Sequence, residues 1–173
     1  MCSCSRLILL PIACMLASAA PSFSQDAPSN LRPPAGERQL FAAHAKGDQI
    51  YTCKSTGAQY AWVLKGPDAK LFNEQGQHIA SHYAGPTWEA NDHSAVTGRV
   101  VASAASPEPK SIPWLLLSAV NHSGSGVMTR VLSVQRLNTN GGAAPAGGCD
   151  TAHAGAETRA SYTADYRFFG KTE

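Results

Sequence analysis

The side chains best suited to catalysis or ligand binding lie in one stretch, residues 60–100. Its ionisable candidates are His78, His82, Glu89, Asp92 and His93. Acid–base chemistry needs two ionisable groups in different environments, and burial against an indole ring raises the pKa of a carboxyl group. Glu89 directly follows Trp88 and could meet that condition. A polar turn, in which Asp92 hydrogen-bonds its own backbone, explains the same residues without any site.

The same stretch offers aromatic surfaces and hydrogen-bonding groups to a ligand. The candidate ligand-binding residues are Trp62, His82, Tyr83, Trp88, Glu89 and Asp92. We therefore predict a binding module for a saccharide or another small polar ligand. Two alternatives stay open. One is a cofactor-free hydrolase that uses Glu89 with Asp92 or His82, and the other is a structural or interaction protein whose aromatic residues only fill the core.

No metal or cofactor site is predicted. His78 and His82 are four residues apart, which on a helix would suit zinc, but the flanking turn residues favour a strand. Four residues of strand span about 13 Å, too far for one ion. Motifs of the forms GxSxG, HExxH and GxGxxG are absent, and the GKT of residues 170–172 lacks the first glycine of a phosphate-binding loop.

The first 24 residues have the features of a secretory signal peptide. Arg6 precedes an apolar run, Leu7–Ala20, which ends in small residues and is too short to span a membrane. Lipoprotein anchoring at Cys14 is disfavoured, because Pro11-Ile12-Ala13 is a poor lipobox. No later apolar run is long enough to cross a bilayer, so the sequence predicts a secreted or periplasmic protein.

Two cysteines, Cys53 and Cys149, remain after signal removal. An even number of cysteines in an oxidising compartment predicts a disulfide between them. The formal net charge is +2, and loss of Arg6 leaves 13 basic against 12 acidic residues, or +1. Such a balance excludes the strong positive field with which proteins attract nucleic acid. The sequence gives no oligomeric state.

Turn signals divide the chain into short segments. A Pro-rich arm over residues 25–38 precedes a single domain over residues 39–170. Residues 39–45 could form one helical turn. Strands are predicted over 49–53, 60–64 and 77–83, with a turn at Gly66–Ala69 and another at Asn73–Gly76.

The second half is predicted to consist of hairpins and one long loop. The predicted strands cover residues 87–90, 95–102, 114–120, 127–136 and 159–169. A Gly/Ala-rich loop covers residues 138–157, and Cys149 would anchor it. In the last strand, Tyr162, Ala164, Tyr166 and Phe168 share one face. Short strands with frequent turns predict an all-β fold, an antiparallel β-sandwich with a barrel-like form as the alternative.

Five segments together resemble the domain-of-unknown-function family numbered 3455, which contains secreted bacterial and fungal proteins. They are YAWVLKGPDAKLF, HYAGPTWEANDHSAVTG, IPWLLL, VQRLNTNGGAAPAGGC and YTADYRFF. The resemblance covers roughly residues 40–169 and implies no activity. His82, Glu89, Asp92, Trp114 and both cysteines fit the family pattern. A glycine commonly stands at the place of His93, which implies that His93 is a variant turn residue.

Overall fold

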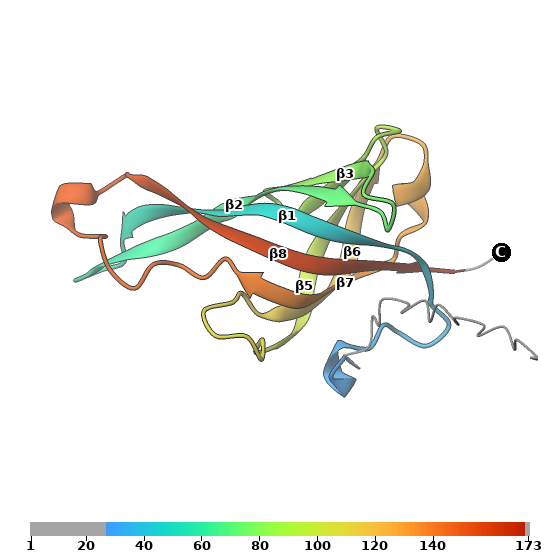
Figure 1. The fold of residues 1–173 in the computed structure, drawn as a ribbon, viewed down its shortest axis with the longest axis horizontal. Helices are drawn as coiled ribbons and strands as arrows, with labels where there is room; N and C mark the ends of the chain where they lie inside the picture. The colour runs from blue at the N-terminus through green and yellow to red at the C-terminus, as the bar shows by residue number, and fades with distance from the viewer. Residues whose placement is uncertain (1–26, 172–173) are drawn as a thin grey trace, which may run out of the picture.

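Eight antiparallel strands form one sheet in the computed structural model, which describes residues 27–171. Each strand pairs with the next, and β8 pairs back with β1, so the ring of strands closes (Figure 1). The all-β antiparallel prediction is confirmed, and the closed pairing corresponds to its barrel-like form. The strands are β1 Arg38–Ser55, β2 Tyr60–Phe72, β3 His78–Tyr83, β4 Thr87–Ala90, β5 Ala95–Ala104, β6 Trp114–Ser123, β7 Ser133–Gly141 and β8 Glu157–Gly170.

Two strands are much longer than the sequence indicated. The helical turn predicted over residues 39–45 is wrong, because these residues belong to β1 and pair with β8. The turn predicted at Gly66–Ala69 is also wrong, because β2 continues through it. The register shifts there, because Ile50 pairs with Gly66 and Tyr51 pairs with Leu64, which leaves Lys65 as the extra residue of a bulge. Gly66, beside the bulge, has φ +155°. Pairing with neighbouring strands therefore overrides the local turn chemistry of glycine and proline.

The predicted turns of the β2–β5 region are otherwise present. Asn73–Gly76 connects β2 to β3, and residues 91–94 connect β4 to β5. The predicted return strand over residues 127–136 is partly wrong, because Val127–Arg130 forms a 3-10 helix, η2. Strand β7 begins after it, at Ser133, and takes in the first four residues of the predicted long loop.

The core fills the inside of the strand ring. The four β8 side chains predicted to share one face are buried, with Tyr162, Ala164, Tyr166 and Phe168 each at most 3% exposed. Alanines on β1, β2 and β3 share this interior and leave room for the larger rings. Gly98 also leaves room for a large ring, since a Cβ at this position would lie only 3.1 Å from the ring of Trp88.

A second, smaller cluster lies outside the ring. Leu31, in the 3-10 helix η1 (Ser29–Leu31), packs with Trp114, Leu116 and Leu137 and is fully buried. The Leu31 carbonyl accepts a hydrogen bond of 2.5 Å from the Gln135 side chain. Residues of the Pro-rich arm thus cover the outer face of β6 and β7.

The predicted disulfide is confirmed. Cys53, near the end of β1, is bonded to Cys149, and their Cα atoms lie 5.4 Å apart. Cys149 lies in the segment between β7 and β8, beside the 3-10 helix η3 (Thr151–His153). Figure 1 shows this segment at the end of the molecule where β1, β2 and β8 extend farthest from the ring.

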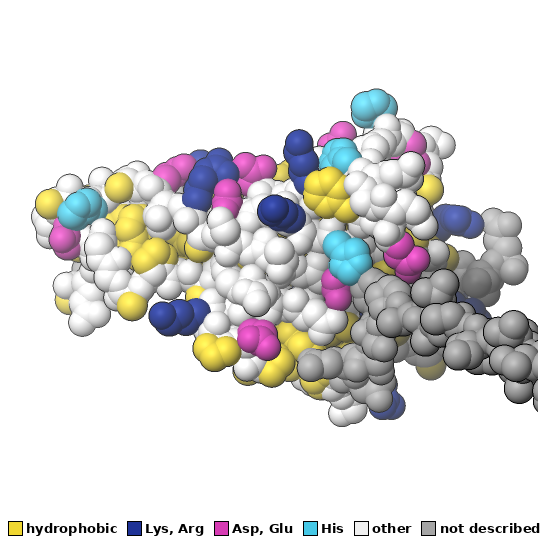
Figure 2. Space-filling view, viewed as in Figure 1, with side chains coloured by type: hydrophobic (Ala, Val, Ile, Leu, Met, Phe, Trp, Pro, Cys, Tyr) yellow, Lys and Arg dark blue, Asp and Glu magenta, His cyan; other side chains and the backbone are white. Residues whose placement is uncertain are grey.

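Surface charge is mixed. Figure 2 shows basic and acidic side chains interspersed over one face, which accords with the near-balanced composition.

Within residues 27–171, no helix has the length and apolar character needed to cross a membrane. The predicted signal peptide, residues 1–24, lies outside the described residues.

Candidate functional site

Two of the predicted site residues, His82 and Trp88, lie inside the strand ring. They are cross-strand partners on β3 and β4, and their rings stack with centroids 4.4 Å apart. His82 Nδ1 is 2.9 Å from the Thr87 carbonyl oxygen. Burial is the main cause that lowers the pKa of His82, to about 3, so the side chain is neutral at ordinary pH.

Glu89 and Tyr83 lie on the opposite face of the same strands. Glu89 pairs with Ser81, one position away from the His82–Trp88 pair, and alternate side chains of a strand point to opposite faces. The hydroxyl of Tyr83 donates to Glu89 Oε2 over 2.7 Å, and this bond raises the pKa of Tyr83. The expected partnership of Glu89 with His82 is therefore corrected: the sheet separates them.

Asp92 stabilises the β4–β5 turn through hydrogen bonds. Its Oδ1 accepts hydrogen bonds from the Ser94 amide and hydroxyl, and its Oδ2 accepts from the Val127 amide over 2.9 Å. These bonds, led by the Ser94 hydroxyl, lower the pKa of Asp92. The carboxylate thus fastens η2 to the hairpin. Gly126 is required beside it, because a Cβ at that position would collide with the carboxylate.

Two further candidate residues, His93 and Trp62, lie away from the His82–Trp88 pair and have structural roles. His93 is exposed and has φ +64°, a left-handed conformation that suits the glycine of the family pattern. Trp62 lies at the far end of β2, opposite Cys53, and its Nε1 donates to the Gly147 carbonyl over 2.8 Å. Trp62 therefore covers the disulfide-linked segment and shares no surface with Trp88.

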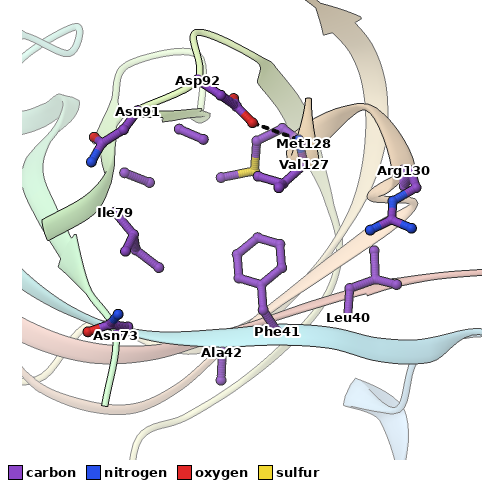
Figure 3. A pocket seen from close by; sticks show the side chains of 12 residues that line it. Leu40, Phe41, Ala42, Asn73, Ile79, Asn91, Asp92, Val127, Met128 and Arg130 are labelled. Atoms are coloured by element: carbon purple, nitrogen blue, oxygen red, sulfur yellow. Dashed lines mark hydrogen bonds between the residues drawn. The ribbon is translucent and has the colours of Figure 1, made fainter. Parts of the chain in front are cut away.

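A pocket of about 490 Å³, here called the end pocket, opens at one end of the ring (Figure 3). Its walls are mainly apolar, with Phe41, Ile79 and Met128 facing its centre. The amides of Asn73 and Asn91 on its rim already hydrogen-bond protein groups, as does Asp92. The end pocket thus offers a ligand apolar surface and few uncommitted polar groups.

A second pocket of about 300 Å³, the inner pocket, reaches into the ring beneath β2 and β5. Leu64 and Val100 at its mouth are 53% and 48% exposed. Apart from Lys65, which is exposed and paired with Glu157, its polar lining is deeply buried. The buried groups come from five strands: Gln49 of β1, His82 of β3, Trp88 of β4, Arg136 of β7 and Tyr166 of β8.

Three buried polar atoms of the inner pocket's lining residues have no hydrogen-bond partner among the described residues. They are Gln49 Nε2, Trp88 Nε1 and the Tyr166 hydroxyl. Native proteins pair nearly all such groups, because leaving one unpaired costs about 1–3 kcal/mol. Burial is the main cause that raises the pKa of Tyr166, so its hydroxyl stays protonated. Smaller opposing contributions come from Arg136 and Tyr162, whose contacts with the hydroxyl do not reach full hydrogen-bond geometry.

Arg136 brings a positive charge to the inner pocket. It is 9% exposed, and its Nε and Nη2 both donate to the Pro113 carbonyl, over 3.1 and 2.9 Å. Its charge opposes ionisation of His82 and favours ionisation of Tyr166. The inner pocket therefore has a hydrogen-bonding, electropositive interior and an apolar mouth.

Sequence reasoning missed Gln49, Arg136 and Tyr166 as site residues. Alternation in the last strand groups Tyr166 with Tyr162, Ala164 and Phe168 on one face, and this face lies inside the ring. Arg136 shares a face with the buried Val134, and this alternation was the available signal. Within residues 27–171, no cluster of three His, Cys, Asp or Glu residues could hold a metal ion.

Comparison with known proteins yields one family. The family described as "Protein of unknown function (DUF3455)" matches residues 34–170. No curated protein and no solved structure matches the chain.

Proposed function

This chain belongs to the DUF3455 family, a family of unknown function, and we propose from its own geometry that it binds a small polar ligand in the inner pocket. The observation that carries this proposal is the set of three buried polar atoms without protein partners on residues lining a 300 Å³ pocket. A ligand that accepts hydrogen bonds from Gln49, Trp88 and Tyr166 would satisfy groups that are otherwise costly to bury.

The arrangement favours a small ligand held inside the ring over a saccharide stacked on the surface. Surface stacking would require aromatic rings that share an exposed face. Trp88 is 1% exposed, Trp62 is bound to the disulfide-linked segment, and Tyr83 lies on the outer face. The hydrolase alternative requires Glu89 with His82 or Asp92, and no contact between these groups supports it.

Tyr166→Phe tests the proposal, because it removes one unpartnered hydroxyl and keeps the ring. We expect binding to weaken about five-fold or more, as for the loss of one hydrogen bond of about 1 kcal/mol. The free energy of unfolding should change by no more than about 1 kcal/mol, since the buried hydroxyl makes no hydrogen bond of full geometry and interacts only weakly with Tyr162 and Arg136. Benzamide is a suitable probe, titrated while the indole N–H signal of Trp88 is followed by NMR.

Glu89→Gln is the matched control, because Glu89 lies on the outer face of the sheet. It should leave benzamide binding unchanged. A titration that moves the Trp62 indole signal and leaves that of Trp88 in place would put the ligand elsewhere. Failure of benzamide, benzoate, hexanamide and hexanoate alike to move the Trp88 signal would overturn the proposal.

A further inference from the structure

The charge inside the strand ring has no counter-charge. Arg136 is the one buried arginine among the described residues, and neither Asp nor Glu occurs among their buried side chains. None of the ion pairs found in residues 27–171 includes Arg136. Burying an unpaired charge costs several kcal/mol, so natural proteins usually pair such groups.

The guanidinium also keeps unused donors. Arginine has five N–H donors. Two of those in Arg136 bond to Pro113 and one interacts weakly with the Tyr166 hydroxyl, which leaves two. Its partners across the sheet are Leu115 and Tyr166, which also line the inner pocket. Arg136 thus stands beside the Tyr166 hydroxyl, with which it interacts without a hydrogen bond of full geometry. His82 adds no second charge because burial keeps it neutral.

We propose that the ligand of the inner pocket is a small carboxylate with an apolar body, whose carboxylate pairs with Arg136. This inference rests on the proposed function and specifies its ligand class. A carboxylate accepts several hydrogen bonds, and arginine–carboxylate bonds are stronger than those between neutral groups. Gln49 and Tyr166 are donors for its remaining lone pairs, and both are nine-tenths or more buried.

The apolar part of the lining fixes the orientation of the ligand. Leu64 and Val100 are exposed at the mouth, while Leu115 and Leu117 lie farther inside the ring. The carboxylate lies at Arg136 and the apolar body extends toward the mouth, where Leu64 and Val100 cover it. A free inorganic anion would leave this apolar surface uncovered and is therefore a poorer ligand.

Pairs of probe ligands with the same shape, one a carboxylate and the other its neutral amide, test the effect of ligand charge separately from ligand shape. Benzoate is compared with benzamide, and hexanoate with hexanamide, by calorimetric titration of the full-length protein near neutral pH. The carboxylate of each pair should bind about ten-fold tighter or more, as expected for one charge-assisted contact. Arg136→Gln should abolish that difference while the amides still bind. Its thermal unfolding temperature should stay the same or rise, because an uncompensated buried charge has been removed.

The outcomes separate this inference from the proposed function. If none of the four probes binds, both fall. If acid and amide bind equally well to the wild type, the proposed function stands and the carboxylate is excluded. If Arg136→Gln keeps the preference for the acid, Arg136 is not its partner. The comparison on the wild type decides the ligand class even if the variant does not fold.

Discussion

At the scale of single residues, adjacent side chains on β3 and β4 point to opposite faces of the sheet and differ in their surroundings. His82 and Trp88 are sealed inside the ring, whereas Tyr83 and Glu89, one position away from each, form a hydrogen bond on the outside. Asp92 accepts two hydrogen bonds from Ser94 in its own turn and one from Val127, which ties η2 to that turn. The interior instead gains its polar character from Gln49, Arg136 and Tyr166. These three lie on the neighbouring strands β7, β8 and β1, which are far apart in the sequence and meet through strand pairing.

The buried His82 predicts a pH dependence of stability. Its pKa is lowered from 6.5 to about 3 in the folded protein, chiefly by burial. Between these values the unfolded chain binds a proton that the folded protein excludes, so the free energy of unfolding falls as pH falls. We expect a contribution of about 1.4 kcal/mol per pH unit between about pH 6 and pH 4.

His82→Phe tests this, because phenylalanine retains an aromatic ring beside Trp88 but cannot be protonated. Urea unfolding of the variant at several pH values should show a slope shallower by about that amount. His78→Phe, at an exposed position on the same strand, controls for loss of a histidine. An unchanged slope in the His82 variant would mean that the folded protein admits a proton at this ring.

At the scale of elements, β6 and β7 are covered on both faces by different parts of the chain. Their inner residues, including Leu117 and Val134, belong to the core of the ring. Their outer residues Leu116 and Leu137 are buried beneath Leu31. This double cover explains why the run from Trp114 to Leu117 is continuously apolar instead of alternating.

Leu31→Ala should therefore destabilise the protein although Leu31 lies outside the ring of strands. Loss of a fully buried leucine side chain is expected to lower the free energy of unfolding by about 2–4 kcal/mol, measured by chemical denaturation. Val120→Ala is the matched control, because Val120 is 54% exposed and its truncation should cost no more than about 0.5 kcal/mol. Equal, small effects of both changes would show that the arm contributes little to the fold.

At the scale of the whole molecule, the ring closes through β1 and β8, and one disulfide fastens the segment that joins the last two strands. The two cysteines are 96 residues apart in sequence, so their bond constrains most of the unfolded chain. Trp62 adds a hydrogen bond to the same segment at Gly147. A disulfide suits an oxidising compartment, which is compatible with an extracellular location.

Removal of the disulfide should lower stability substantially without loss of the sheet. For Cys53→Ser/Cys149→Ser we expect a decrease of about 2–5 kcal/mol in the free energy of unfolding, from chain entropy. Circular dichroism should still report β structure, and reduced wild-type protein should behave like the variant. Mass spectrometry of the unreduced wild type should show two hydrogens fewer than the free thiols require. A variant as stable as the wild type would contradict this account of the bond.

The sequence by itself determined those properties that depend on local pattern. Alternation separated the two faces of β8, and turn residues located the β2–β3 and β4–β5 connections. Composition excluded a strongly basic surface, and the two cysteines outside the predicted signal peptide identified the disulfide. Each of these follows from the period of a strand, the backbone freedom of a few residues or simple counting.

Tertiary structure alone decided which residues share a site. Pairing with β8 makes a strand of residues 39–45, and pairing with β1 makes a strand of Gly66–Ala69. His82 pairs with Trp88 and points inward, whereas Glu89, the residue after Trp88, pairs with Ser81 and points outward. No local sequence signal fixes this register. Arg136 became a candidate ligand contact only because closure of the ring surrounds it with side chains from distant strands and with no acid.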